Sequence, residues 1–170
     1  SPLVLVSSLK SAMVVEPKYL VFPDCTLNSA FSNSLTRDFS RLFCAKESLS
    51  GPCVVAFADT LFKADFKLDA TADGAIWVKQ VKDPSAFGVV KLKEGFITDF
   101  VEKPKEYVSD LAIIGIYYFK DISLIRDELH THLQDELPPG KEYLLNHGIE
   151  KMIEKKKTFK SQEIDIWMDC

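Results

Sequence analysis

The sequence lacks the features that would place it at once in several large classes of proteins. Its 21 Lys and Arg residues stand against 25 Asp and Glu, so the formal net charge of −4 offers no basic field to a nucleic-acid backbone. The opening apolar run, residues 2–6, is far too short to cross a bilayer and has no charged front end like that of a signal peptide. Internal repeats, heptad patterns and a P-loop are also absent. We therefore expect neither nucleic acid nor a membrane as a partner.

Paired cysteines are missing as well. Cys25, Cys44, Cys53 and Cys170 contain no Cys-x-x-Cys pair, and Cys53 opens an apolar segment where a small buried thiol fits well. This usage predicts a reducing, cytoplasmic setting. The 46% of apolar and 27% of charged residues are ordinary for a globular protein, and 170 residues suffice for one domain or for part of a larger one.

Apolar periodicity predicts strands mixed with helices. Continuous apolar runs at residues 3–6, 53–58 and 111–119 indicate strands buried on both faces, and residues 75–81 and 158–167 are also strand-like. Helical spacing covers residues 27–46, 121–133 and 142–155. Residues 87–92 and 96–101 form a predicted hairpin around Glu94-Gly95. Together these patterns predict an α/β fold with a mixed, mainly parallel sheet flanked by helices.

Two acids that follow strands are candidate metal ligands. Asp59 ends the second apolar run, and the carboxyl ends of strands are where α/β sheets bind ligands. Mg²⁺ prefers one or two carboxylates together with phosphate oxygens, and Asp169, which follows the last strand-like segment, is a candidate for the second. A helix N-cap or a turn acid explains Asp59 about equally well on spacing alone.

An acid and a base lie side by side at the end of the predicted hairpin, in Glu102-Lys103-Pro104. Such a pair can bind a sugar hydroxyl through the carboxylate and a phosphate through the ammonium group. An exposed charge pair at a hairpin end is the commoner explanation of the triplet alone. His130 and His132 point to different faces of a helix and are interpreted as surface residues.

The order of these segments resembles the sugar nucleotidyltransferase family, the pyrophosphorylases that make nucleotide sugars. The resemblance begins at Cys44 and covers about three-quarters of the chain. It rests on five segments in the family's order: residues 55–62, 81–89, 100–104, 112–119 and 167–169.

The resemblance implies a Rossmann-like nucleotide-diphospho-sugar transferase fold over residues 1–170, with Mg²⁺ as cofactor. It implies that Asp59 and Asp169 bind the metal and act in catalysis, with Ala58 in place of the usual glycine. Glu102 would bind sugar hydroxyls, Lys103 the sugar phosphate, and Gly88 the sugar through its backbone. The other substrate-binding positions implied are Phe87, Gly115 and Tyr117.

Residues 1–43 depart from the family and form a divergent nucleotide side, whereas residues 44–170 form the sugar-phosphate and metal side. Ser8 and Lys10 replace glycines that let backbone N–H groups approach a triphosphate, and Ala12 replaces an arginine. Lys18 is a candidate catalytic cation, although a solvated loop lysine is about as good an interpretation. Asn146 and His147 replace a common Thr-Asp pair.

The implied function is transfer of a nucleotidyl group from a nucleoside triphosphate to a sugar 1-phosphate, with release of pyrophosphate. The altered glycines and arginine support an alternative, a non-catalytic sugar-phosphate-binding or regulatory subunit of such an enzyme. We also expect a homo-oligomer, because relatives commonly assemble and an uncovered sheet edge favours association. The sequence identifies neither the sugar nor the base.

Overall fold

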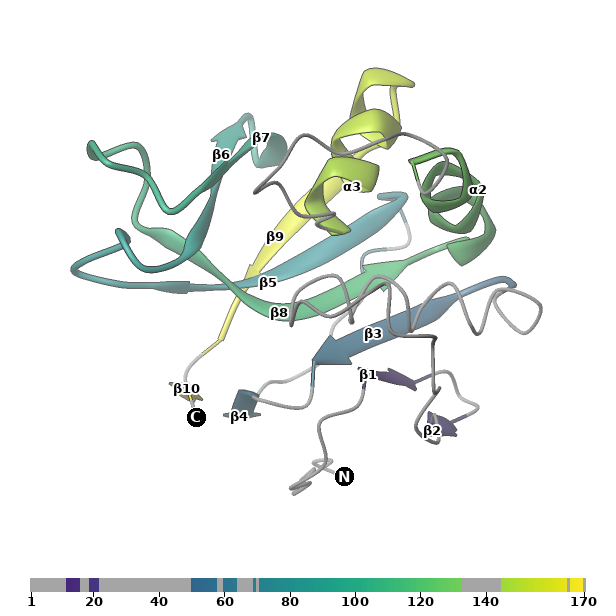
Figure 1. The fold of residues 1–170 in the computed structure, drawn as a ribbon, viewed down its shortest axis with the longest axis horizontal. Coiled ribbons are helices and arrows are strands. Elements are labelled where there is room, and N and C mark those ends of the chain that lie inside the picture. The colour runs from purple at the N-terminus through teal and green to yellow at the C-terminus, as the bar shows by residue number, and fades with distance from the viewer. Residues whose placement is uncertain are drawn as a thin grey trace, which may run out of the picture.

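The chain folds around one large sheet (Figure 1). The computed structural model describes residues 12–15, 19–21, 50–57, 60–63, 69, 71–132, 145–164 and 166–169. Eight strands form the large sheet in the order β2-β1-β3-β8-β5-β9-β7-β6. Their bounds are β1 (Ala12–Val15), β2 (Tyr19–Val21), β3 (Cys53–Phe57), β5 (Gly74–Gln80), β6 (Gly88–Lys93), β7 (Phe96–Glu102), β8 (Leu111–Phe119) and β9 (Phe159–Glu163).

A second, two-stranded sheet and two helices complete the described part. The small sheet pairs β4 (Thr60–Lys63) with β10 (Ile166–Asp169), and the helices are α2 (Ile122–His132) and α3 (Leu145–Glu154). Both helices fall within the segments predicted for them. Neither is long and apolar enough to cross a membrane.

The expectation of a mainly parallel sheet is wrong for the described strands. Their pairings are antiparallel with one exception, the parallel pairing of β5 with β9. The prediction rested on apolar runs, which are typical of strands covered on both faces. Strand β8, the apolar run at residues 111–119, contributes side chains to the clusters on both faces and yet pairs antiparallel with β3, β5 and β6. Apolar runs report burial of both faces and not the direction of the neighbouring strand.

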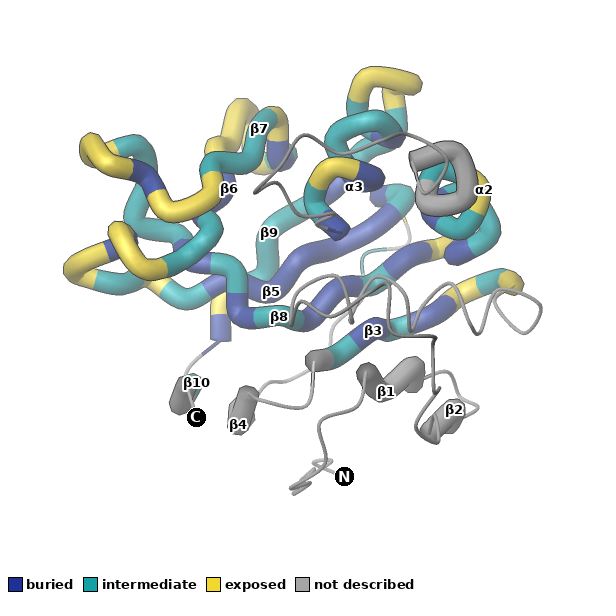
Figure 2. Tube along the Cα trace, viewed as in Figure 1, coloured by how far each residue is buried: buried dark blue, intermediate teal, exposed yellow. Residues whose placement is uncertain are grey.

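Buried residues are concentrated along the central strands (Figure 2), and they pack into two clusters, one on each face of the sheet. On one face, α2 and α3 pack against the sheet through apolar side chains of both helices, among them Ile122, Ile125, Ile149 and Met152. On the other face, a smaller cluster surrounds the fully buried Trp77. The buried Cys53 belongs to the helix-covered cluster, as its apolar surroundings predict.

The predicted hairpin is confirmed, with its turn at the expected residues. Strands β6 and β7 pair from Gly88 opposite Glu102 to Lys93 opposite Phe96. The two residues between them, Glu94 and Gly95, have φ values of 54° and 82°. Positive φ at both central positions is the conformation that suits the right-handed twist of a two-residue hairpin. The turn sets the register of the first pairs, and an irregularity between Lys91 and Leu92 shifts the pairing by one residue, so that Gly88 lies opposite Glu102.

One of the N-terminal strands includes Ala12, the residue that replaces the family's arginine. Ala12 and Met13 begin β1, which pairs antiparallel with β3 so that Ala12 lies opposite Phe57. The position that the resemblance assigns to a phosphate-binding arginine therefore belongs to a strand. The predicted strand at residues 3–6 and the predicted helix at residues 27–46 lie outside the described residues.

The single strand predicted at residues 158–167 is two strands in two different sheets. Strand β9 lies between β5 and β7 in the large sheet, whereas β10 pairs with β4 in the small one. Ile164, which lies between them, is buried against the Trp77 face. The last segment of the chain thus carries Asp169 out of the large sheet, beside the strand that follows Asp59 in sequence.

Candidate functional site

Gly88 lies at the centre of a group of residues from four elements, which we call the Gly88 cluster: Gly88, Glu102, Ile113, Tyr117 and Asn146. A Cβ atom built on Gly88 would lie 2.7 Å from Glu102 Oε2, 3.6 Å from Ile113 Cδ1 and 3.8 Å from Asn146 Nδ2. Strand β6 supplies the glycine, β7 the carboxylate and α3 the amide. The missing side chain of Gly88 leaves room for the Glu102 carboxylate to lie over its backbone.

Strand β8 contributes the floor of the cluster. The hydroxyl of Tyr117, a residue only 5% exposed, donates a hydrogen bond to Asn146 Oδ1 at 3.4 Å. Gly115, two residues earlier, has a φ of 79°, a conformation that favours glycine. It lies where the pairing of β8 with β5 shifts register between Ile76 and Val78. The glycine is therefore required by an irregularity of β8 next to the cluster, which is a structural reason for its presence.

Lys103 is held at the end of β7 by the start of β6. Its backbone N–H donates to the Phe87 carbonyl at 3.1 Å, and its φ of 44° is left-handed. This conformation costs on the order of 1–3 kcal/mol in a residue with a side chain. The side chain is exposed, and the buried Pro104 follows it. The strained backbone places an exposed ammonium group directly after the carboxylate of Glu102.

An aromatic contact joins this region to the small sheet. The rings of Phe87 and Trp167 meet edge to face, with centroids 5.2 Å apart and planes at 69°. Trp167 Nε1 is buried and has no hydrogen-bond partner among the described residues. Because Trp167 lies in β10, two residues before Asp169, the contact connects the strand carrying Asp169 to the strand end carrying Gly88.

The pairing in the small sheet places one candidate metal ligand, Asp169, beside the residue that follows the other, Asp59. Asp169 lies in β10 opposite Thr60, the first residue of β4. Asp59 immediately precedes Thr60 in sequence and lies outside the described residues, as does Lys18. The part of the chain that the structure describes holds no group of three or more His, Cys, Asp and Glu suited to a metal ion. The predicted roles of Asp59, Asp169 and Lys18 stay predictions.

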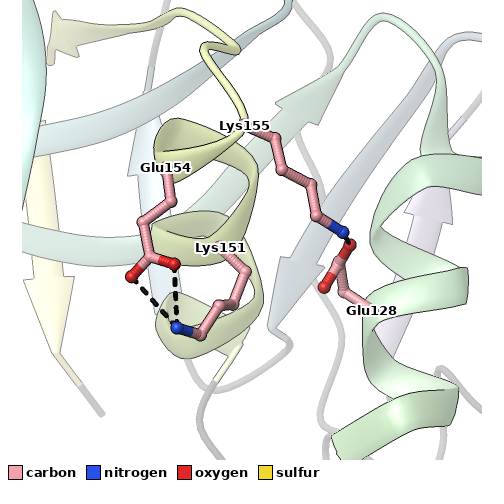
Figure 3. Close-up of polar contacts among 4 residues, drawn as sticks. All are labelled: Glu128, Lys151, Glu154 and Lys155. Carbon is pink, nitrogen blue, oxygen red and sulfur yellow. Dashed lines mark hydrogen bonds and ion pairs between the residues drawn. The ribbon is translucent and has the colours of Figure 1, made fainter.

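Helix α3 packs on the sheet through apolar residues, and an ion pair just past its end connects it to α2 (Figure 3). Its buried residues include Leu145 and Ile149 on either side of Asn146 in sequence. Lys155 Nζ forms an ion pair with Glu128 of α2, whose side chain is 15% exposed, and Lys151 pairs with Glu154 at 2.8 Å. The exposed Lys151 pair adds little, but the bond to Glu128 connects the two helices. The helix is therefore a supported platform for Asn146.

The negative charges along α3 influence one another. Burial raises the pKa of the Glu150 carboxyl group above its ordinary value, and the nearby carboxylates of Asp99 and Glu154 raise it further. Glu150 lies one helical turn beyond Asn146, and Asp99 lies in β7, three residues before Glu102.

Comparison with known proteins places this fold among the nucleotide-sugar pyrophosphorylases. The crystal structure of a nucleoside-diphosphate-sugar pyrophosphorylase from Vibrio cholerae superposes with a TM-score of 0.62 at 18% identity, covering 81% of this chain and 59% of that chain. Such a distant likeness establishes the fold alone. Residues 39–170, more than half of the chain, match the Nucleotidyl transferase family, and the chain therefore belongs to that family.

Two curated relatives are similar over part of the chain. A mannose-1-phosphate guanylyltransferase catalytic subunit beta from Drosophila pseudoobscura pseudoobscura is 34% identical over 99 residues, which are 57% of this chain and 24% of that protein. A glucose-1-phosphate thymidylyltransferase from Streptomyces antibioticus is 31% identical over 97 residues, which are 55% of this chain and 26% of that protein. The chain thus aligns with about a quarter of the length of these relatives.

The structure brings together Gly88, Glu102 and Tyr117 from the residues predicted for the site, and it places Phe87 and Lys103 beside them. Asn146 is a member that sequence reasoning did not select. The helical spacing of its segment puts it at the margin of the apolar face formed by Leu145 and Ile149, and a polar residue in that position was the available signal.

Proposed function

We propose that the chain binds a sugar 1-phosphate at the Gly88 cluster and takes part in transfer of a nucleotidyl group to it from a nucleoside triphosphate. The observation that carries the proposal is the convergence of Gly88, Glu102 and Lys103 at one end of the β6–β7 hairpin. A carboxylate lies over a glycine backbone, and an exposed ammonium group follows it directly. These groups match the hydroxyls and the phosphate of the same small ligand.

The roles of the three residues follow from their chemistry. The ionised Glu102 carboxylate only accepts hydrogen bonds, so it selects hydroxyl donors of a sugar. Gly88 leaves the space in which a ring can approach the backbone. Lys103 supplies a point charge for the phosphate, and its left-handed backbone holds the start of its side chain at the end of β7.

The proposed cofactor, Mg²⁺, fits the donors that the sequence supplies. Asp59 and Asp169 are two hard carboxylate ligands, a number that suits an ion which also takes phosphate oxygens and water. The pairing of Thr60 with Asp169 supports their convergence, because adjacent residues of a chain lie 3.8 Å apart between Cα atoms. When bound, the metal would neutralise charge on the phosphates.

The proposed reaction needs no covalent intermediate with the protein. An oxygen of the sugar 1-phosphate forms a bond to the α-phosphorus of the triphosphate, and the bond from that phosphorus to the bridging oxygen of pyrophosphate breaks. The contribution of this chain is to hold the sugar phosphate in line for attack and to offset its charge through Lys103.

Pyrophosphate release from a matrix of substrates tests the proposal. Mannose 1-phosphate with GTP and glucose 1-phosphate with dTTP are the first pairs to try, because the relatives' names contain those sugars and nucleotides. Asp59→Asn and Asp169→Asn should each lower the rate by on the order of 100-fold or more, whereas Thr98→Ala on the exposed side of β7 should leave it unchanged. An unchanged rate in Asp59→Asn would remove that residue from the mechanism.

The second candidate function is that of a sugar-phosphate-binding subunit without catalysis. The observation that favours it is Ala12, which lies in β1 at the position of the expected phosphate-binding arginine. Calorimetry separates the two functions. Tight binding of a triphosphate with Mg²⁺ supports the enzyme and contradicts the subunit, and binding of sugar phosphate alone does the reverse.

A further inference from the structure

Asn146 has a polar environment that the packing of α3 does not explain. It is the second residue of the helix, partly exposed, between the buried Leu145 and the buried Gly148 and Ile149. An apolar residue would suit the packing of this turn on the sheet. Instead the side chain presents an amide to the Gly88 cluster.

The Tyr117 hydroxyl determines which way the amide faces. Because that hydroxyl donates to Asn146 Oδ1, the carbonyl oxygen points toward β8 and the NH₂ group is left for the other side. Nδ2 lies 3.8 Å from the Cβ position of Gly88. No described residue accepts a hydrogen bond from it, and it is not among the buried polar atoms that lack a partner, so it is open to a ligand.

Glu102 and Asn146 form a complementary pair around the glycine. The carboxylate is an acceptor and the amide nitrogen a donor, and no other residue in the described part of the chain forms a hydrogen bond with either group. Since Glu102 Oε2 and Asn146 Nδ2 lie 2.7 and 3.8 Å from one point, they are at most about 6.5 Å apart. One hydroxyl oxygen can join a donor and an acceptor up to about 6 Å apart with two bonds of ordinary length. A spacing within this bound allows one sugar hydroxyl to donate to Glu102 and to accept from Asn146.

We propose that Asn146 binds a sugar hydroxyl through Nδ2 and helps determine which sugar 1-phosphate the chain accepts. The inference rests on the proposed function, and it assigns to this chain a specificity contact of its own. Tyr117 acts as a positioning residue, because it orients the amide without itself needing to touch the sugar. An epimer that turns the hydroxyl away from the pair loses both bonds and leaves the carboxylate and the amide unpaired.

The test is calorimetric titration of the 170-residue chain and its variants with mannose 1-phosphate, glucose 1-phosphate and their monodeoxy derivatives, without a triphosphate. We expect Asn146→Ala to weaken binding of the preferred sugar about 3- to 10-fold. Removal of one particular hydroxyl should weaken binding to the wild type by at least as much. When that hydroxyl is removed, the affinity of Asn146→Ala should fall less than the affinity of the wild type, because one of the two partners of the hydroxyl is already missing.

Two further variants keep the result interpretable. Asn146→Asp conserves the shape of the side chain but replaces the donor with a second carboxylate beside Glu102, so binding should weaken more than in Asn146→Ala. His147→Ala changes the adjacent exposed residue of α3 and should bind like the wild type. Thermal unfolding of each variant verifies that it is folded.

Three results would overturn the inference. The first is unchanged affinity in both Asn146 variants. The second is that removing each sugar hydroxyl costs Asn146→Ala as much affinity as it costs the wild type. That result would mean that the residue acts through helix packing and not through a hydroxyl. The third is a loss of equal size in His147→Ala. Failure of the wild type to bind any sugar 1-phosphate would refute the proposed function itself, so the two failures are distinguishable.

Discussion

Replacement of Gly88 by alanine is the perturbation that most directly tests the geometry of the cluster. The glycine does not have a positive φ, so its backbone accepts a side chain without strain. The added Cβ would lie 2.7 Å from Glu102 Oε2, and that atom ends a flexible, exposed side chain. The carboxylate can therefore move away at little cost, and the effect should fall on ligand binding and not on folding.

The magnitude follows from the distances. To reach the ordinary contact distance of 3.4 Å, Oε2 has to retreat by at least about 0.7 Å from the new methyl group. A shift of that size lengthens a hydrogen bond to a sugar hydroxyl beyond its useful range. A hydrogen bond to a charged group contributes about 1.5–3 kcal/mol, so affinity for the sugar 1-phosphate should fall roughly 10- to 100-fold. The free energy of unfolding should change by less than about 1 kcal/mol.

Calorimetry and denaturant unfolding of Gly88→Ala, Glu102→Ala and the double variant supply the assay. If alanine acts by displacing the carboxylate, the double variant should bind no more weakly than Glu102→Ala alone, since the two changes remove the same interaction. Additive losses would show that the methyl group obstructs the sugar directly. Wild-type affinity in Gly88→Ala would refute the whole placement of the sugar beside this glycine.

The remaining predictions concern stability. Gly74→Ala should cost about 2–3 kcal/mol of unfolding free energy in denaturant, because its Cβ would lie 2.3 Å from the buried Phe159 ring. Asp121→Ala should cost about 1 kcal/mol by the same measurement, since its carboxylate accepts the second backbone N–H of α2 as an N-cap. Burial opposes ionisation of Asp73, but hydrogen bonds from Thr158 and its neighbouring lysine outweigh it and lower the pKa. Stability from a lowered carboxyl pKa is present above the unfolded value near 4 and is lost as pH falls, so urea midpoints should decline more steeply below about pH 4 in the wild type than in Asp73→Asn.

Local signals in the sequence predicted local structure well. The hairpin was predictable because Glu94 and Gly95 sit between two apolar strands, and a two-residue loop leaves few alternatives. The helices were predictable because one face of each carries regularly spaced apolar residues. Strand direction was not predictable. Strands β5 and β8 are covered on both faces, and the sequences of such strands look alike in parallel and antiparallel sheets. Direction is set by pairing between distant segments, which composition does not record.

The residues of the candidate site likewise fall into those that local sequence patterns predict and those that they do not. Gly88, Glu102 and Lys103 were predictable because they belong to one hairpin and short motifs describe it. Asn146 was noticed as a departure from the family but could not be interpreted, since its meaning depends on α3 lying over β6 and β8. That placement results from the burial of Ile149 and its neighbours, a property of the core and not of the motif.

The small sheet shows why a motif needs a tertiary support before it can act. A two-stranded sheet is at best marginally stable alone, so the pairing of β4 with β10 requires an anchor in the rest of the molecule. The contact of Trp167 with Phe87 is such an anchor, because it joins β10 to the residue whose carbonyl holds Lys103. The same aromatic pair therefore connects the strand of Asp169 with the lysine proposed to meet the phosphate. Trp167 also packs against the cluster around Trp77, so the strand of Asp169 is anchored both to the sugar side of the proposed site and to the core.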